Sequence, residues 1–98
     1  MDDVEKLLNE IKEDESVVKT RFSANFLDSV SEIYEKHGFG ATKAFLLDKQ
    51  QRRELKKQAT ALLNVLNKFE KYPRVKDDRR IGRIIIKILG TLTSQRRR

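Results

Sequence analysis

One stretch, from Leu55 to Tyr72, carries the longest regular apolar pattern in the chain. Its apolar residues recur at alternating steps of four and three: Leu55, Ala59, Leu62, Leu66 and Phe69, with Leu63 and Tyr72 extending the stripe. This spacing is typical of a helix with one apolar face. Because such a face must be covered, we expect the other segments to pack as helices against it.

Length and composition limit how that face is covered. The chain has 98 residues, of which 38% are hydrophobic and 38% charged, so one small domain with a thin core is expected over residues 1–98. A thin core favours a homodimer that shares apolar surface. The absence of cysteine excludes disulfides and cysteine-based metal sites or nucleophiles.

Two helices are predicted in the N-terminal half. An acidic helix within residues 1–15 has its apolar residues on one side and Asp2 or Asp3 as its cap. A second helix begins at Ser23, where Phe22 and Leu27 occupy the positions of a hydrophobic staple. We expect Gly38 to end it in a left-handed conformation.

The centre of the chain has two interpretations. Thr42 is predicted to cap a further helix, but seven consecutive polar residues follow Leu47. Either one helix spans residues 42–71, or a short helix ends at Leu47 and a new one starts with Asp48 as its cap. We favour the continuous helix because no glycine or proline marks a break.

The C-terminal segment is predicted to be a helix with Asp78 as its cap. A strand over Arg83–Leu89 is the alternative, but no other segment provides a partner strand. The helix carries more apolar residues than a thin core covers, which suggests an interface made of Ile81, Ile84, Ile85, Ile88, Leu89 and Leu92. Residues 93–98 are expected to form a basic, mobile tail. The predicted fold is therefore an all-α bundle of four to five helices with one long central helix, forming a homodimer.

Charge is distributed unevenly along the chain. The net charge is +7, yet residues 1–15 contain seven acidic and two basic residues. Residues 73–98 contain nine basic and two acidic residues. An acidic N-terminal segment and a basic C-terminal segment have two interpretations. Either the basic half binds nucleic acid and the acidic segment moderates that binding, or the two segments make head-to-tail contacts between subunits.

The basic residues carry the functional hypothesis. Phosphate contacts are predicted for Lys49, Arg52, Arg53, Lys56, Lys57, Arg79, Arg80, Arg83, Lys87, Arg96, Arg97 and Arg98. Lysine and arginine bind phosphate oxygens and release counterions, and arginine does so in a bidentate manner. We therefore expect a small regulator or architectural protein that binds DNA or RNA. The alternative is an interaction or assembly adaptor whose protein partner contacts the isoleucine-rich helix.

No residue pattern indicates catalysis, a cofactor or a metal. His37 is the only histidine, and its place at a predicted helix end is explained by the helix dipole. The acidic pairs lack the spacing of a calcium loop. The longest apolar run, residues 84–86, is too short to span a membrane, and no signal peptide is recognised, so a cytoplasmic, non-enzymatic protein is expected.

Two short segments resemble known families. Residues 33–42, IYEKHGFGAT, resemble the turn between the first two helices of TetR-type repressor domains, within a partial helix-turn-helix pattern over residues 30–47. The helix-turn-helix pattern requires a small residue where this chain has Tyr34. It also requires a second turn, which this chain does not show after Leu47. The segment IGRIII resembles the first helix of archaeal histones, but it lies last in this chain. No functional residue is carried over from either family.

Overall fold

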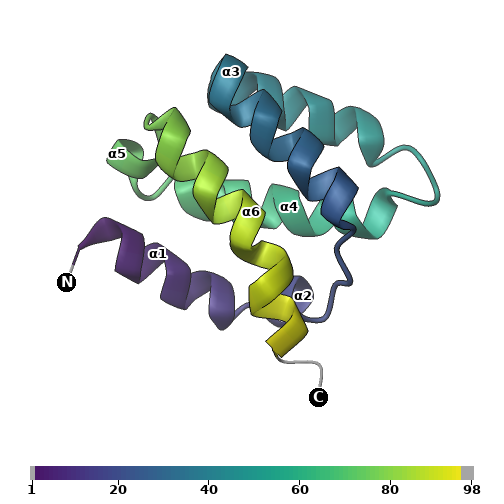
Figure 1. Cartoon of the computed structure of the whole chain (residues 1–98), viewed down its shortest axis with the longest axis horizontal. Coiled ribbons are helices and arrows are strands. Elements are labelled where there is room, and N and C mark those ends of the chain that lie inside the picture. Colours follow the sequence, from purple (N-terminus) through teal and green to yellow (C-terminus); the bar gives the residue numbers. More distant parts are fainter. Residues whose placement is uncertain (1, 96–98) are drawn as a thin grey trace.

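The computed structural model describes residues 2–95, and within this range the chain is entirely helical apart from its connections (Figure 1). The elements are α1 (Asp3–Lys12), α2 (Glu15–Val18), α3 (Ala24–Lys49), α4 (Lys56–Phe69), α5 (Pro73–Lys76) and α6 (Arg79–Gln95). The all-α prediction is confirmed. The described range holds six helices rather than four or five, because α2 and α5 are short helices of four residues within predicted connections.

Side chains predicted to cap helices do so at three places. Asp2 accepts a hydrogen bond from the Glu5 amide at 2.8 Å and caps α1. Ser23 accepts one from the Phe26 amide at 3.2 Å and caps α3. Asp78 accepts from the amides of Arg80 and Ile81, where α6 begins. Each cap satisfies amides that have no acceptor inside the helix.

Helix α3 bends sharply at Gly38, so that its two halves diverge in Figure 1. Gly38 has φ 89° and ψ −172°, a region open essentially to glycine alone, and helical structure resumes directly after it. The predicted break at Gly38 and the helical stretch after it are therefore confirmed, although Gly38 is not in the left-handed helical conformation. Thr42 lies inside the second stretch and does not cap it, so that prediction is wrong. The buried Thr42 hydroxyl instead donates to the Gly38 carbonyl at 2.8 Å, so this polar group has a hydrogen-bond partner although it is shielded from water.

The predicted continuous helix over residues 42–71 is wrong. Helix α3 ends at Lys49, and short-range backbone bonds such as Arg52 N–H to the Lys49 carbonyl, at 3.0 Å, turn the chain before α4. The Asp48-capped alternative is also wrong, because α4 starts after Leu55 without a side-chain cap. A polar run with no apolar side gains nothing from helical packing, whereas the turn lets α4 fold back against α3.

Helix α4 is the centre of the core, as its apolar stripe predicts. Ala59, Leu62, Leu66 and Phe69 are all buried. Val65 and Ala61 are buried as well, since α1 and α2 cover α4 on one side and α3 on the other. Leu55, Leu63 and Tyr72 are half-buried at the margins of the core.

Helix α6 packs mainly along α3, and the strand alternative is wrong. The contact is closest where Gly82 faces the buried ring of Tyr34, whose hydroxyl donates to the Lys76 carbonyl. The helix continues through Thr93, which is buried and donates to the Leu89 carbonyl at 3.0 Å, so the expected tail does not begin there. Residues 96–98 of that predicted tail lie outside the described residues.

Candidate functional site

The turn between α3 and α4 presents four of the predicted basic residues to solvent. Arg52 and Arg53 lie in the turn, and Lys56 and Lys57 lie in the first turn of α4. All four are exposed, and none of their side chains has a hydrogen bond or ion pair with another residue of the range 2–95. Lys49 differs, because it lies 5.1 Å from the centre of the Phe45 ring and 3.8 Å from an Asp48 carboxylate oxygen.

A cleft of about 870 Å³ lies between this end of α4 and the segment that joins α2 to α3. Lys56 and Lys57 line one wall, and Lys19 and Arg21 line the other. A hydrogen bond of 2.8 Å from the Ser23 amide to the Gln58 side chain holds the two segments together. The sequence prediction missed Lys19 and Arg21, because residues 16–40 are balanced in charge and no local pattern shows which element they approach.

We name the six cations at this end of the molecule the basic end: Lys19, Arg21, Arg52, Arg53, Lys56 and Lys57. Arg53 also lines a shallow hollow with Lys56, which connects the turn to the cleft. One carboxylate, Glu54, lines the cleft as well. Five other cations in the described range lack a side-chain partner, but none of them lines the cleft: Lys6, Lys12, Lys43, Arg74 and Arg80.

The start of α4 is electrostatically unfavourable in isolation. The first turn holds two lysines and no acidic residue, and Leu55 provides no side-chain cap. The amino end of a helix carries partial positive charge, so adjacent ammonium groups are repelled and anions are favoured. The backbone amides of this turn also lack intrahelical acceptors. A negatively charged ligand would offset the positive charge at this helix end and would accept hydrogen bonds from these amides.

The basic residues of α6 are used mostly within the fold. Arg79 donates to the Lys36 carbonyl at 2.9 Å, Arg83 lies 3.3 Å from Glu35, and Lys87 lies 3.7 Å from Asp28. These contacts join α6 to the first half of α3, and two of them pair a cation of α6 with a carboxylate. Arg80 is exposed with no side-chain partner in residues 2–95, and Arg96, Arg97 and Arg98 lie outside the described residues.

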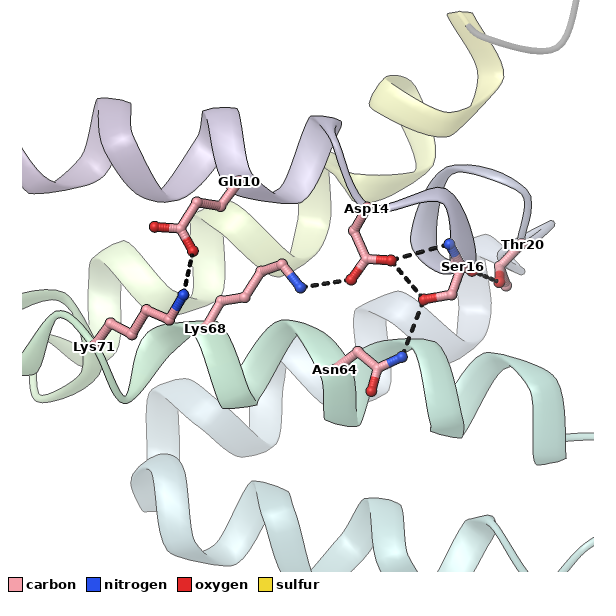
Figure 2. Close-up of polar contacts among 7 residues, drawn as sticks. All are labelled: Glu10, Asp14, Ser16, Thr20, Asn64, Lys68 and Lys71. Carbon is pink, nitrogen blue, oxygen red and sulfur yellow. Dashed lines mark hydrogen bonds and ion pairs between the residues drawn. The ribbon is translucent and has the colours of Figure 1, made fainter.

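The acidic N-terminal segment pairs with the other end of α4, as Figure 2 shows. Asp14 accepts from Lys68 at 2.5 Å, and Glu10 accepts from Lys71 at 3.1 Å. The Tyr72 hydroxyl also donates to Glu10. Two acidic residues, Glu10 and Asp14, therefore pair with lysines at and just beyond the C-terminal end of α4, whereas its N-terminal end stays positive.

These contacts perturb both carboxyl groups. The Tyr72 hydrogen bond, followed by that of Lys71, lowers the pKa of Glu10. Burial alone would raise the pKa of Asp14, but hydrogen bonds from Lys68 and Ser16 outweigh it and the pKa is lowered. Both groups therefore hold their negative charge toward the lysines of α4.

The predicted interface residues of α6 have different environments. Ile85 and Leu89 are buried in the core of a single chain, together with Ile86, which the predicted set omits. Ile81, Ile88 and Leu92 are half-buried, and only Ile84, at 46% exposure, is open to solvent. The apolar face is thus partly used by the chain itself, and its role as an interface stays a prediction.

Other candidate chemistry finds little support in residues 2–95. His37 is exposed near the bend of α3, and no three potential metal-ligating side chains converge in the described part of the chain. Ala44 and Leu47 are exposed, which does not fit a helix-turn-helix interpretation that needs them in the core. None of the helices described here has both the length and the apolar content to cross a bilayer.

Comparison with protein-family models, with curated proteins and with solved structures finds no match to this chain.

Proposed function

We propose that this protein binds nucleic acid through the basic end. The observation that carries the proposal is the unequal neutralisation of α4. Lys68 and Lys71 at its C-terminal end are paired with acidic residues, whereas Lys56 and Lys57 at the other end are exposed and unpaired within the described range. A surface that gathers six unpaired cations at one end of the molecule, four of them lining a cleft, is suited to a polyanion.

The contacts expected at such a surface are with phosphates. Lysines supply mobile point charges, and the guanidinium groups of Arg21, Arg52 and Arg53 match the geometry of phosphate oxygens. Each phosphate neutralised releases condensed counterions, which yields affinity that weakens steeply with salt. Arg79, Arg83 and Lys87 of α6, which already contact α3, are expected to contribute less than the basic end.

The test is a salt titration of duplex binding by matched double variants. Lys56→Gln with Lys57→Gln removes two charges from the basic end, and Lys6→Gln with Arg74→Gln removes two exposed charges from α1 and α5. Fluorescence anisotropy with labelled DNA should show that the first pair lowers the magnitude of the log-affinity against log-salt slope by about two units. The control pair should leave the slope nearly unchanged.

Stability measurements separate lost binding from lost folding. Removing two lysines from the positive end of the α4 dipole should raise the free energy of unfolding, by about 0.3–1 kcal/mol for each lysine. The first variant should therefore be more stable in urea yet bind more weakly. Wild-type protein that binds no nucleic acid at about 50 mM salt, where non-specific contacts are strong, would overturn the proposal.

A second candidate function is that of an assembly adaptor or homodimer that uses α6. The specific observation in its favour is Ile84, a large apolar residue left 46% exposed beside half-buried Ile88. Exposed apolar residues at one edge of a helix are suited to a protein partner. This function predicts no salt-dependent affinity for nucleic acid, so the same titration distinguishes it from the first.

A further inference from the structure

We infer that the basic end prefers double-stranded over single-stranded nucleic acid and contacts its backbone rather than its bases. This inference rests on the proposed function and adds the class of ligand. It follows from what surrounds the six cations, in particular from where the aromatic rings lie.

Every aromatic ring of the chain is already engaged within the fold. The sequence contains five phenylalanines, two tyrosines and no tryptophan, all inside the described range, and none of these seven residues is exposed. Phe45 stacks on Phe26, with ring centres 6.4 Å apart, and Lys49 covers it. Phe39 lies 4.8 Å from the Lys76 ammonium. No aromatic residue lines the cleft between α2 and α4.

Single-strand binding usually depends on rings of this kind. Unpaired bases stack on aromatic side chains, and each such contact is worth about 1–3 kcal/mol. In the described part of the basic end, guanidinium planes are the only available stacking surfaces. A single strand would therefore gain the charge contacts without the stacking that offsets the cost of ordering a flexible chain.

The neutral polar groups of the cleft are also largely occupied. Thr60 accepts from the Gln50 amide at 2.9 Å, Asn64 donates to Ser16 at 3.0 Å, and the Thr20 hydroxyl donates to the Ser16 carbonyl at 2.8 Å. These hydrogen bonds reduce the number of neutral donors and acceptors that are free to read base edges. The lysines and arginines that remain are expected to contact phosphates, and such contacts carry no sequence information.

Charge density favours the duplex as well. A duplex carries one charge per about 1.7 Å of axis, so it places more phosphates within reach of a compact cluster than one strand does. Six contacts predict a salt slope of about −5 for duplex DNA and about −4 for a single strand. The two slopes differ by about one unit. With equal affinities at 1 M salt as the reference, the duplex then binds about tenfold or more tightly than the single strand at about 50 mM salt.

The experiment compares one DNA duplex of about two helical turns, about 20 base pairs, with each of its separated, unstructured strands. Anisotropy titrations of the wild-type full chain at three salt concentrations provide both affinities and slopes. We expect the duplex to bind roughly tenfold more tightly at the lowest salt. A scrambled duplex of the same composition should bind with an affinity within a factor of about two, because no base contacts are involved.

The outcomes separate the two proposals. Single strands that bind as tightly as the duplex, or more tightly, would overturn the duplex preference and leave nucleic-acid binding intact. A much lower affinity for the scrambled duplex would overturn the inference that the protein contacts the backbone rather than the bases. No binding to duplex or single strands at the lowest salt would remove the proposed function itself.

Discussion

At the scale of single residues, the contact between Gly82 and Tyr34 controls how closely α6 approaches α3. A Cβ atom on Gly82 would lie 2.2 Å from the Tyr34 ring, which is fully buried and packs edge-on against Phe69 with ring centres 5.7 Å apart. The Tyr34 hydroxyl is held by the Lys76 carbonyl, so the ring has no simple way to move aside. Burial, with a smaller contribution from Asp77, raises the pKa of that hydroxyl, which keeps it a donor.

Gly82→Ala is therefore expected to destabilise the protein. Overpacking of this kind costs about 1–3 kcal/mol. Gly40→Ala is the matched control, because no atom lies within 4 Å of a Cβ there and the position is exposed in α3. The control should raise stability by about 0.5–1 kcal/mol through helix propensity. Urea unfolding of both variants measures the difference, and equal effects of the same sign would contradict the packing argument.

At the scale of the element, α6 has two apolar sides with different roles. Residues three and four apart share a helix face, so Gly82, Ile85, Ile86 and Leu89 form one side that is buried against the rest of the chain. Ile84 and Ile88 lie on the adjoining edge, where Ile84 is exposed. A test of association must therefore address this edge and leave the buried side intact.

Ile84→Asp and Ile85→Asp are expected to behave differently. Ile85→Asp places a charge at a position that is 2% exposed and should unfold the chain, which loss of far-UV helical signal would reveal. Ile84→Asp should keep the helical signal and, if copies associate through the edge of α6, lower the solution mass from dimer to monomer. Wild-type protein that sediments as a monomer at high micromolar concentration would contradict the homodimer proposal.

At the scale of the whole molecule, charge is divided between the two ends of α4. The N-terminal acidic segment covers the end that carries Lys68 and Lys71, and it adds Leu7 and Ile11 to the core. These pairs link the first part of the chain to residues more than fifty positions away. The N-terminal acidic segment thus forms ion pairs within its own chain. The N-terminal end of α4 keeps its positive charge and remains accessible to a ligand.

Stability should depend on pH through this link. The pKa values of Asp14 and Glu10 are lowered in the folded chain, from ordinary values of 3.8 and 4.5. A lowered folded pKa contributes stability that is fully present above the unfolded pKa and is lost as pH falls through the folded pKa. The free energy of unfolding should therefore be nearly constant from neutral pH to about pH 5 and decrease below it.

Asp14→Asn isolates the contribution of one pair. Asparagine still caps α2, but it loses the charge toward Lys68, so stability at neutral pH should fall by about 1–2 kcal/mol. The decrease in stability below about pH 5 should also become shallower. Glu70→Gln, an exposed position without an ion pair in the described range, controls for removal of a negative charge near α4. If both variants show the wild-type pH profile, the Asp14–Lys68 pair does not contribute as argued.

Helical character, the central apolar face of residues 55–72 and three caps follow from short stretches of the sequence. Asp2, Ser23 and Asp78 were predictable because a cap involves only residues two or three positions away. The four exposed cations around the α3–α4 turn were also predictable, since they are close together in the chain.

Which elements meet, and which charges remain unpaired, depends on how the helices pack in three dimensions. The polar run after Leu47 carries no local signal of a break, but the chain turns there and α4 packs back against α3. Lys19 and Arg21 join Lys56 and Lys57 across the cleft, whereas Arg83 and Lys87 are paired with α3. Local periodicity reports the state of one segment, but neutralisation depends on side chains that are distant in sequence and become neighbours only when the core forms.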